Sequence, residues 1–444
     1  MANPQGLEFR FDWESAPGVR APELRATWAR LEVWVGGTCV TQVEDALTAS
    51  ARNSIYVSLY PLAEWIAYNW WLLVADSRPL ALDRAKWSAS SIVGRRDLYA
   101  KWMFHHNLRL IGEGMPWPDL TIIPDIDSCH LAWFGDAATP PWRTLRFLRF
   151  GHAELPLDQI QGALAQFVVA VLTRLAEMNV TATSLETEWE RVTGLAPDEV
   201  QFCTAAGRMG LDPFAEDFDV DAALVDASHS LDSDLLTDFL NAVDPGRIAA
   251  GVQWVEQARS KVMAARTQTP RYLAELRGQQ LVANSDEPPW SLGYRRAAAV
   301  REAVSLIPGE RFPVLEYFRV LELAGDDLGL QAVGGLSGAG TPVVVSSQPG
   351  SSTSKGFLAA RALWHQIQAN GAPYLITNAR TRKEKAERAF AAEVLAPAVG
   401  IRGLLPESQV VPAHAVESIS RHYNVSPLLV QHQIENQLGL SIET

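Results

Sequence analysis

The sequence predicts an α+β protein with several domains, in which a strand-rich N-terminal region is followed by mainly helical regions. A chain of 444 residues is too long for one ordinary hydrophobic core. Eleven of the fifteen tryptophans fall within the first 150 residues, among short runs of aromatic and β-branched residues. From about Leu155 onward, apolar residues recur every three or four positions, which is the helical period. These observations together indicate separate units of different secondary structure.

Residues 1–150 are expected to form a strand-rich domain whose type the sequence leaves open. Runs that favour strands lie between Gly, Pro and Asp at 7–13, 29–37, 54–60 and 119–126. The segment 58–76 interrupts them, because Pro61 suits a first helical turn and apolar residues follow it at helical spacing. One helix is therefore predicted inside this domain.

Residues 151–285 are expected to form an α-helical domain. The first helix shows one apolar face, made of Ile160, Leu164, Phe167, Val168, Val171, Leu172 and Leu175. Further amphipathic helices are predicted at 184–194, 198–210, 232–243 and 249–268, separated by Gly, Pro or Asp. The polar, Pro-containing stretch ANSDEPPW at 283–290 marks the boundary to the last unit.

Residues 286–444 are expected to form a third unit of mixed structure. Helices are predicted at 293–306, 313–325, 357–368 and 382–397, with two closing helices within 415–440. Two apolar runs around a Gly-rich turn predict a β-hairpin at 328–347. No internal repeat is evident in the chain.

This last unit resembles the ImmA/IrrE family of bacterial and phage metallopeptidase-like domains. The stretches that carry the resemblance are GTPVVVSS, GFLAARALWH, EKAERAFAAEVLAP and HYNVSPLLVQHQIENQLGL, which cover roughly residues 286 to 444. The most specific of them is FAAEVLAP, followed by a Val-Ser turn. The resemblance implies a zincin-like α+β fold, in which two His of an HExxH helix and a downstream Glu hold zinc.

The resemblance also implies that this chain has lost the zinc chemistry. Carried over position by position, the first His is Arg361, the general base is Ala362, the second His is His365 and the downstream Glu is Glu384. Arginine does not lose its proton to become a ligand, and alanine neither accepts a proton nor orients water. The sequence therefore predicts a degenerate HExxH motif with no catalytic residue, no metal and no cofactor.

Family members act in stress responses, in the control of mobile elements and in defence modules, commonly on a regulatory protein. The resemblance therefore implies a non-catalytic, protein-binding or regulatory component of a bacterial stress-response, mobile-element or phage-defence system. The net charge of −13 disfavours nucleic acid as the partner. No apolar run reaches the length of a membrane span and the N-terminus lacks a signal peptide, so we expect a cytoplasmic protein. Cys39, Cys129 and Cys203 form no metal-binding pair and are expected to be buried thiols.

Two alternatives remain open from the residues themselves. A hydrolase or nuclease site in the N-terminal domain would use His105, Asp125, Asp127 and His130, although His105 and His106 would face opposite sides of a strand. A nucleic-acid-binding regulator would use the basic run Arg380, Arg382, Lys383, Lys385 and Arg388, in which Glu384 and Glu387 are interleaved.

Overall fold

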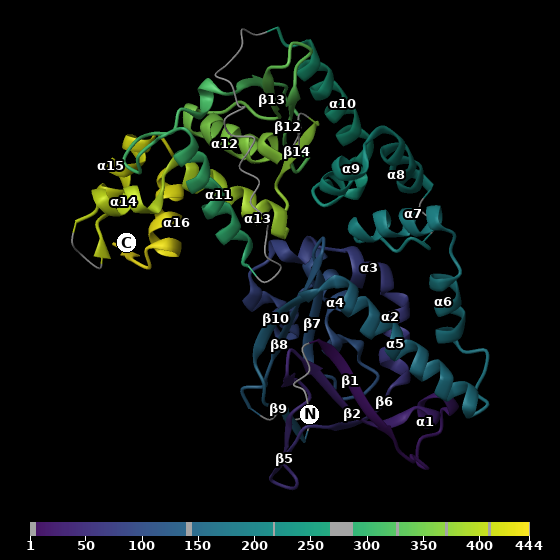
Figure 1. Cartoon of the computed structure of the whole chain (residues 1–444). Coiled ribbons are helices and arrows are strands. Elements are labelled where there is room, and N and C mark those ends of the chain that lie inside the picture. The colour runs from purple at the N-terminus through teal and green to yellow at the C-terminus, as the bar shows by residue number, and fades with distance from the viewer. Residues whose placement is uncertain are drawn as a thin grey trace. The chain divides into compact units, whose positions relative to one another are not determined.

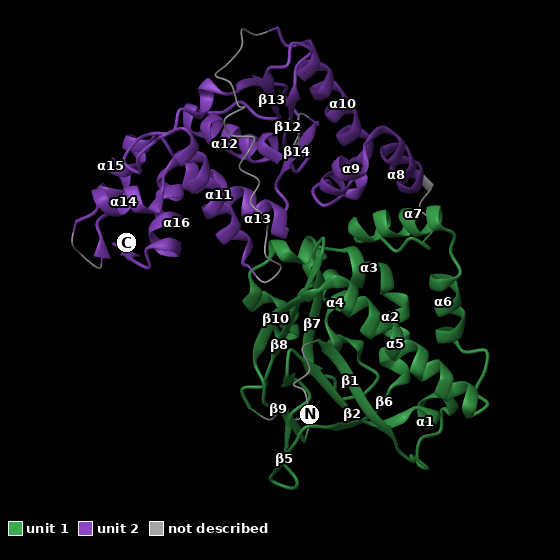
Figure 2. Cartoon of the chain, in the orientation of Figure 1, with its two compact units in different colours: residues 1–217 green, residues 218–444 purple. Residues whose placement is uncertain are grey.

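The structure, a computed structural model, is a mixed α/β protein with a strand-rich N-terminal region and a mainly helical remainder, as predicted. It describes residues 6–138, 144–215, 218–266, 287–325, 328–368, 372–406 and 410–443. The chain divides into two compact units, unit 1 at 1–217 and unit 2 at 218–444 (Figure 2).

Unit 1 contains three small sheets whose described strand pairs are all antiparallel (Figure 1). The first consists of β1 (Leu7–Trp13), β2 (Trp28–Val35), β3 (Thr38–Cys39) and β6 (Ile55–Ser58), the second of β7 (Asp119–Pro124), β8 (Ser128–Phe134) and β10 (Gly151–Pro156), and the third of β4 (Val43–Asp45), β5 (Ser50–Arg52) and β9 (Leu145–Phe147). The four predicted strand segments are confirmed as β1, β2, β6 and β7. The three cysteines are free and buried, as predicted.

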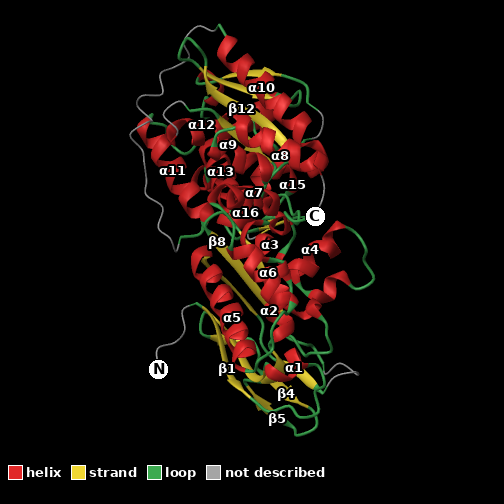
Figure 3. Cartoon of the chain, turned by 90° about the vertical axis from the view of Figure 1, so that its right-hand side faces the viewer, coloured by secondary structure: helices red, strands yellow, loops and turns green. Residues whose placement is uncertain are grey.

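The helices of unit 1 pack on these sheets (Figure 3). They are α1 (Pro22–Ala26), α2 (Tyr60–Tyr68), α3 (Trp70–Ala75), α4 (Leu98–His106), α5 (Leu157–Glu177), α6 (Ser184–Thr193) and α7 (Pro197–Arg208). The helix predicted at 58–76 is present but broken at Asn69, whose side-chain amide donates to the Trp65 carbonyl oxygen at 2.8 Å. The Asn69 side chain thus shares the Trp65 carbonyl oxygen with the Asn69 backbone N–H, which donates to it at 3.0 Å.

Helix α5 is the core helix of unit 1. Its predicted apolar face is buried, and Phe167 packs against Phe9 of β1 with ring centroids 4.5 Å apart. Among the described residues, it is the one helix long and apolar enough to cross a membrane by length and composition. A core helix passes the same test, and the packing of α5 on β1 accounts for its apolar face.

The helices predicted for 151–285 are divided between the two units. Helices α5 to α7 belong to unit 1, whereas α9 (Ser233–Leu240) and α10 (Ile248–Ala264) belong to unit 2, together with α8 (Phe218–Ser230), which was not predicted. Two contacts tie α10 to the last part of the chain: Trp254 Nε1 donates to the Leu323 carbonyl oxygen at 3.2 Å, and Lys261 Nζ donates to the Glu322 carbonyl oxygen at 2.6 Å. The two compact units therefore differ from the three regions that composition suggested, because helices next to each other in sequence pack on different sheets.

The central sheet of unit 2 has the strand order β11-β13-β12-β14. Its strands are β11 (Arg319–Glu322), β12 (Leu330–Leu336), β13 (Pro342–Ser346) and β14 (Tyr374–Thr377), and β12 with β13 forms the predicted hairpin. Alternate residues such as Ala332 and Val344 belong to the core that contains α12, while Gly335 lies near Val262 of α10. Helices thus cover both faces, which explains why the PVVVS run is buried throughout.

The remaining helices of unit 2 pack on this sheet or on one another. They are α11 (Pro289–Ala303), α12 (Ser352–Gln368), α13 (Arg382–Leu395), α14 (Ala398–Leu404), α15 (Ala413–Tyr423) and α16 (Pro427–Gln437), with a short pair of β15 (Val410–Val411) and β16 (Ser441–Ile442). Helices α11 and α13 approach closely at Gly293, where a Cβ atom would lie 2.4 Å from the Ala386 carbonyl oxygen. Only glycine fits at this crossing.

The prediction of a helix at 313–325 is wrong. This segment forms a 3-10 turn at Val314–Glu316 and then strand β11, which pairs in parallel with β13. Its apolar residues fit the helical period, but the β-branched and aromatic residues Tyr317, Phe318 and Val320 also suit a strand. Pairing with the apolar strand β13 decides between the two.

Candidate functional site

Helix α12 places the degenerate motif in the core of unit 2. Each residue from Leu358 to Ile367 is buried, so the helix is covered all round rather than along one face. Trp364 packs against Phe390 of α13, with ring centroids 5.5 Å apart. This packing explains the aromatic residue beside His365 and fixes the rotation of α12 against α13.

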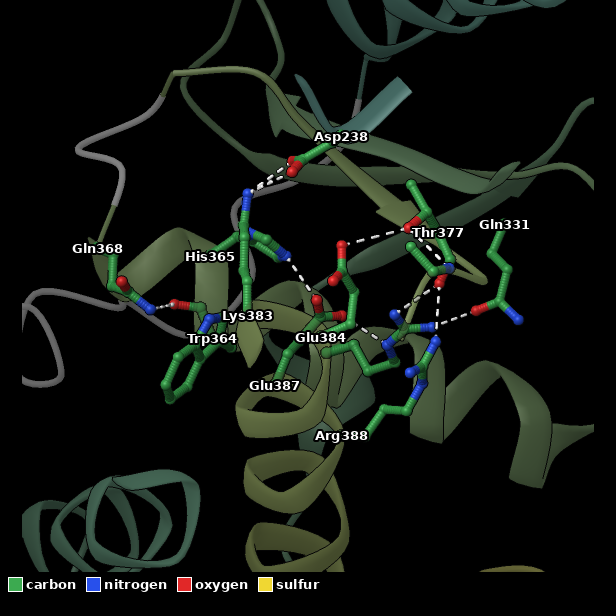
Figure 4. A network of polar contacts seen from close by, with 12 residues as sticks. Asp238, Gln331, Trp364, His365, Gln368, Thr377, Lys383, Glu384, Glu387 and Arg388 are labelled. Atoms are coloured by element: carbon green, nitrogen blue, oxygen red, sulfur yellow. Dashed lines mark hydrogen bonds and ion pairs between the residues drawn. The ribbon is translucent and has the colours of Figure 1, made fainter. Parts of the chain in front are cut away.

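Glu387 joins the two motif positions that carry polar side chains. Arg361 Nε donates to Glu387 Oε1 at 2.5 Å, and His365 Nε2 lies 3.1 Å from Glu387 Oε2 (Figure 4). Arg361 also donates to the Thr377 carbonyl oxygen at 2.9 Å and to Gln331 Oε1. Arg361 and Glu387 are each only 1% exposed in their side chains. The centre of the site is therefore the buried ion pair of Arg361 and Glu387. His365 contacts the second carboxylate oxygen of Glu387.

The environment of Glu387 holds its carboxylate ionised. Burial alone would raise the pKa of Glu387, but the charge of Arg361 and the contacts with His365 outweigh burial and lower it to about 2. An ionised carboxylate in this position satisfies the buried guanidinium, which cannot give up its proton. Burial removes both the Arg361 guanidinium and the Glu387 carboxylate from water, and the attraction between the two charges offsets this desolvation cost.

Glu384, the carboxylate predicted to accompany His365, lies elsewhere. Its oxygens accept hydrogen bonds from the hydroxyls of Thr377 and Thr381, the former at 3.4 Å. Burial raises the pKa of Glu384, and the nearby carboxylates of Asp238 and Glu387 raise it further. The residue that contacts His365 is Glu387, one turn further along α13, which the sequence did not single out as its partner.

The basic run is largely engaged in contacts within unit 2. Lys383 Nζ lies 2.6 Å from Asp238 Oδ2 of α9, and Arg388 donates to the Thr377 carbonyl oxygen at 3.2 Å (Figure 4). Arg382 donates to the Glu287 carbonyl oxygen. Arg380 is exposed and Lys385 is partly buried. Three of the five cations of this run thus spend donors on protein acceptors, which leaves fewer donors for the phosphates of nucleic acid.

Tyr374 closes the site from β14. Its ring stacks on the His365 imidazole, with centroids 4.7 Å apart and planes 8° from parallel. Burial raises the pKa of Tyr374, and its hydroxyl has no hydrogen-bond partner among the described residues. The stacked ring fixes the imidazole plane, so the contact of His365 with Glu387 is preorganised.

The residues around His365 do not fit a catalytic zinc ion. Two ligands of one tetrahedral zinc lie roughly 3.3 Å apart, so the 3.1 Å between His365 Nε2 and Glu387 Oε2 would suit a pair of ligands. A third ligand is needed, and the adjacent position on α12 holds the Arg361 guanidinium. Within the described residues, no three His, Cys, Asp or Glu side chains form a group that could hold a metal.

The alternative site in unit 1 is brought together only in part. His130 Nε2 lies 3.8 Å from Asp125 Oδ2, and His130 Nδ1 lies 3.2 Å from His152 Nε2. His105 instead contacts Asn69 Oδ1 at 2.6 Å, and Asp127 is exposed in the turn between β7 and β8. No described contact joins His105 or Asp127 to the pair of His130 and Asp125.

The prediction of a strand around His105 and His106 is wrong, because these two residues are the last residues of helix α4. Asp97 caps this helix by accepting from the Ala100 backbone N–H at 3.2 Å, and Tyr99, Ala100 and Met103 form its buried face. His106 is buried on this helix and contacts the Ile122 carbonyl oxygen at 2.8 Å, which is a structural role.

Comparisons of this chain with protein-family models, with curated proteins and with solved structures find no match.

The destabilisation caused by Glu387→Gln should depend on pH. Because the pKa of Glu387 is lowered in the folded state, its ionised form contributes stability above the unfolded pKa, and this contribution is lost as pH falls toward about 2. The stability difference between wild type and Glu387→Gln should be full near neutral pH and should shrink below about pH 4.5. Urea unfolding of both proteins across this range checks it, and a constant difference would contradict it.

Proposed function

We propose that this protein is a non-catalytic member of a regulatory system, in which unit 2 is a pseudo-metallopeptidase domain that binds a protein partner. The observation that carries the proposal is the contact set of Glu387, which takes Arg361 on one oxygen and His365 on the other. If α12 derives from a zinc helix, the guanidinium supplies from within the chain the positive charge that a metal would supply. The shape of the domain is then kept without a metal ion.

The proposed setting is a cytoplasmic bacterial stress-response, mobile-element or phage-defence system, with a regulatory protein as the partner. This setting follows from the resemblance of residues 286–444 to the ImmA/IrrE family. The buried, charge-balanced site supports a binding role, because the described residues around His365 offer no base at position 362 and no third ligand. Unit 1 would supply a further interaction surface.

A partner-capture experiment tests the proposal in the native host. Tagged wild-type protein and the variant His365→Asn should capture the same stable protein partner, and treatment with a metal chelator should not release it. Hydrogen exchange in α12 and α13 shows whether the variant keeps unit 2 folded. Loss of the partner from a folded variant, release by the chelator, or the absence of any stable partner would count against the proposal.

The alternative of a unit 1 hydrolase has its own test. We expect the double variant Asp125→Ala, His130→Ala to keep whatever cellular activity the wild-type protein shows, because His105 and Asp127 do not join these residues. Loss of that activity in a variant whose thermal unfolding is unchanged would favour a site in unit 1.

A further inference from the structure

A cavity of about 320 Å³ lies beside Arg361, on the side of α12 that faces the ends of β12 and β13. The first turns of α12 and the start of α16 complete its wall. Six of its polar lining residues are Gln331, Ser347, Thr353, Lys355, Arg361 and Ser426. The volume is at the lower end of the range of small-molecule sites.

The charges around this cavity differ in sign from those of the whole chain. The lining includes two cations, Lys355 and Arg361, and no Asp or Glu stands among the described residues that form it. The chain as a whole carries a formal net charge of −13. The partner carboxylates of these two cations, Glu322 and Glu387, stand outside the lining, so the charged groups on the described wall are hydrogen-bond donors, which favours an anionic ligand.

Arg361 gives this cavity a fixed set of hydrogen-bond donors, while its charge is balanced by Glu387. Its guanidinium is held by Glu387, Gln331 and Thr377, yet a guanidinium has five N–H donors and these described contacts use three of them. Because the ion pair with Glu387 is buried, the orientation of the remaining donors is set before any ligand arrives. A preorganised donor loses little entropy on binding.

Lys355 supplies a second, movable cation from the first turns of α12. Its Nζ atom lies 2.8 Å from Glu322 Oε1, in a pair that is partly exposed on both sides. Exposed pairs of this kind are weak, so Lys355 can turn toward a ligand at small cost. Thr353 and Ser354 add hydroxyls to the lining, and each hydroxyl lies within hydrogen-bond distance of Ser351 Oγ.

We propose that unit 2 binds the phosphate group of a small molecule in this cavity. Lys355, Thr353 and Arg361 all lie on α12 and line the same cavity, so together they can donate to a group with several acceptor oxygens such as phosphate. Phe357, Leu358 and Leu429 form an apolar part of the wall that can take the body of a phosphate monoester. The proposal is independent of whether unit 2 descends from a metallopeptidase.

Ligand-induced stabilisation of the full chain tests this site. Millimolar inorganic phosphate and adenosine monophosphate should each raise the midpoint of thermal unfolding, at constant ionic strength, while adenosine should not. A larger shift with the nucleotide than with phosphate would show that the ligand of the cavity is a phosphate monoester. Equal shifts would show that the ligand is free phosphate. Acetate should act more weakly than phosphate.

The variant Lys355→Gln should weaken phosphate binding on the order of tenfold, because it removes one charge-assisted contact. Arg402→Gln removes the same charge from an exposed position on α14 outside the cavity lining and should leave the affinity unchanged. Three results would overturn the proposal: no stabilisation by phosphate or nucleotide, an equal effect of sodium chloride at the same ionic strength, or equal affinities in Lys355→Gln and wild type.

Discussion

Replacing Glu387 with Gln should destabilise unit 2 by about 3–5 kcal/mol, because it leaves the Arg361 guanidinium buried without a counter-charge. The side chain is only 1% exposed, so water cannot take over the role of the carboxylate. Urea unfolding measures the loss, and hydrogen exchange in α12 and α13 reports on unit 2 separately from unit 1. This is one of the two largest effects expected for a single position of the chain.

Glu384→Gln is the matched control for this substitution. It lies on the same helix, is also buried, and loses the same charge, but its oxygens accept from two threonine hydroxyls rather than from a guanidinium. Since burial already raises the pKa of Glu384, a neutral amide there should cost less than about 1 kcal/mol. Equal losses in the two variants would contradict the assignment of Glu387 as the counter-charge.

A double variant that removes both charges sharpens this test. Arg361→Met combined with Glu387→Leu should be more stable than Glu387→Gln alone, because no unpaired charge remains in the core. The coupling between the two positions should be about 2 kcal/mol or more, as expected for residues in direct contact. Additive losses would show that the pair is not an energetic unit.

The second large effect is a gain of zinc. The double variant Arg361→His, Ala362→Glu turns the stretch at 361–365 into HELWH, which places two His one helical turn apart. His365 and Glu387 already lie at a distance that suits two ligands of one zinc, so the new His would supply the third. We expect close to one zinc per chain in this variant, measured by elemental analysis after dialysis.

Two variants control for adventitious metal in that experiment. Ala362→Glu alone adds a carboxylate without a ligand at position 361 and should bind no zinc. Adding Glu387→Gln to the double variant removes the third of the three protein ligands that such a zinc site needs and should abolish stoichiometric zinc. Zinc that persists unchanged in this last variant would show that Glu387 is not placed as proposed.

The sequence allowed the frame of the site to be predicted, but not its partners. The period of apolar residues located α12 and α13, and the Gly-rich turn located the hairpin of β12 and β13. Glu384 and Glu387 are three residues apart and share one face of α13, so sequence alone could not choose between them. The signal that the sequence did offer was Arg361 within the apolar, Ala-rich stretch FLAARALWH, because a guanidinium on a buried helix requires a carboxylate close by.

Other differences between the structure and the prediction from the sequence also arise from tertiary contacts. Asp238 reaches Lys383 from a helix about 145 residues earlier in the chain, and no local pattern connects the two. Strand β11 was expected to be helical because its apolar spacing fits both periods, and its pairing with β13 decided the outcome. Local pattern thus identified most elements, whereas long-range pairing determined which side chains meet.

The zinc content of the purified wild-type protein tests the central claim most directly. Protein expressed with added zinc and then dialysed should contain far less than one zinc per chain, while the double variant Arg361→His, Ala362→Glu treated in the same way should contain close to one. Stoichiometric zinc in the wild-type protein, lost on His365→Asn, would contradict the account, because the Arg361–Glu387 pair and a zinc ion cannot both occupy the space beside His365.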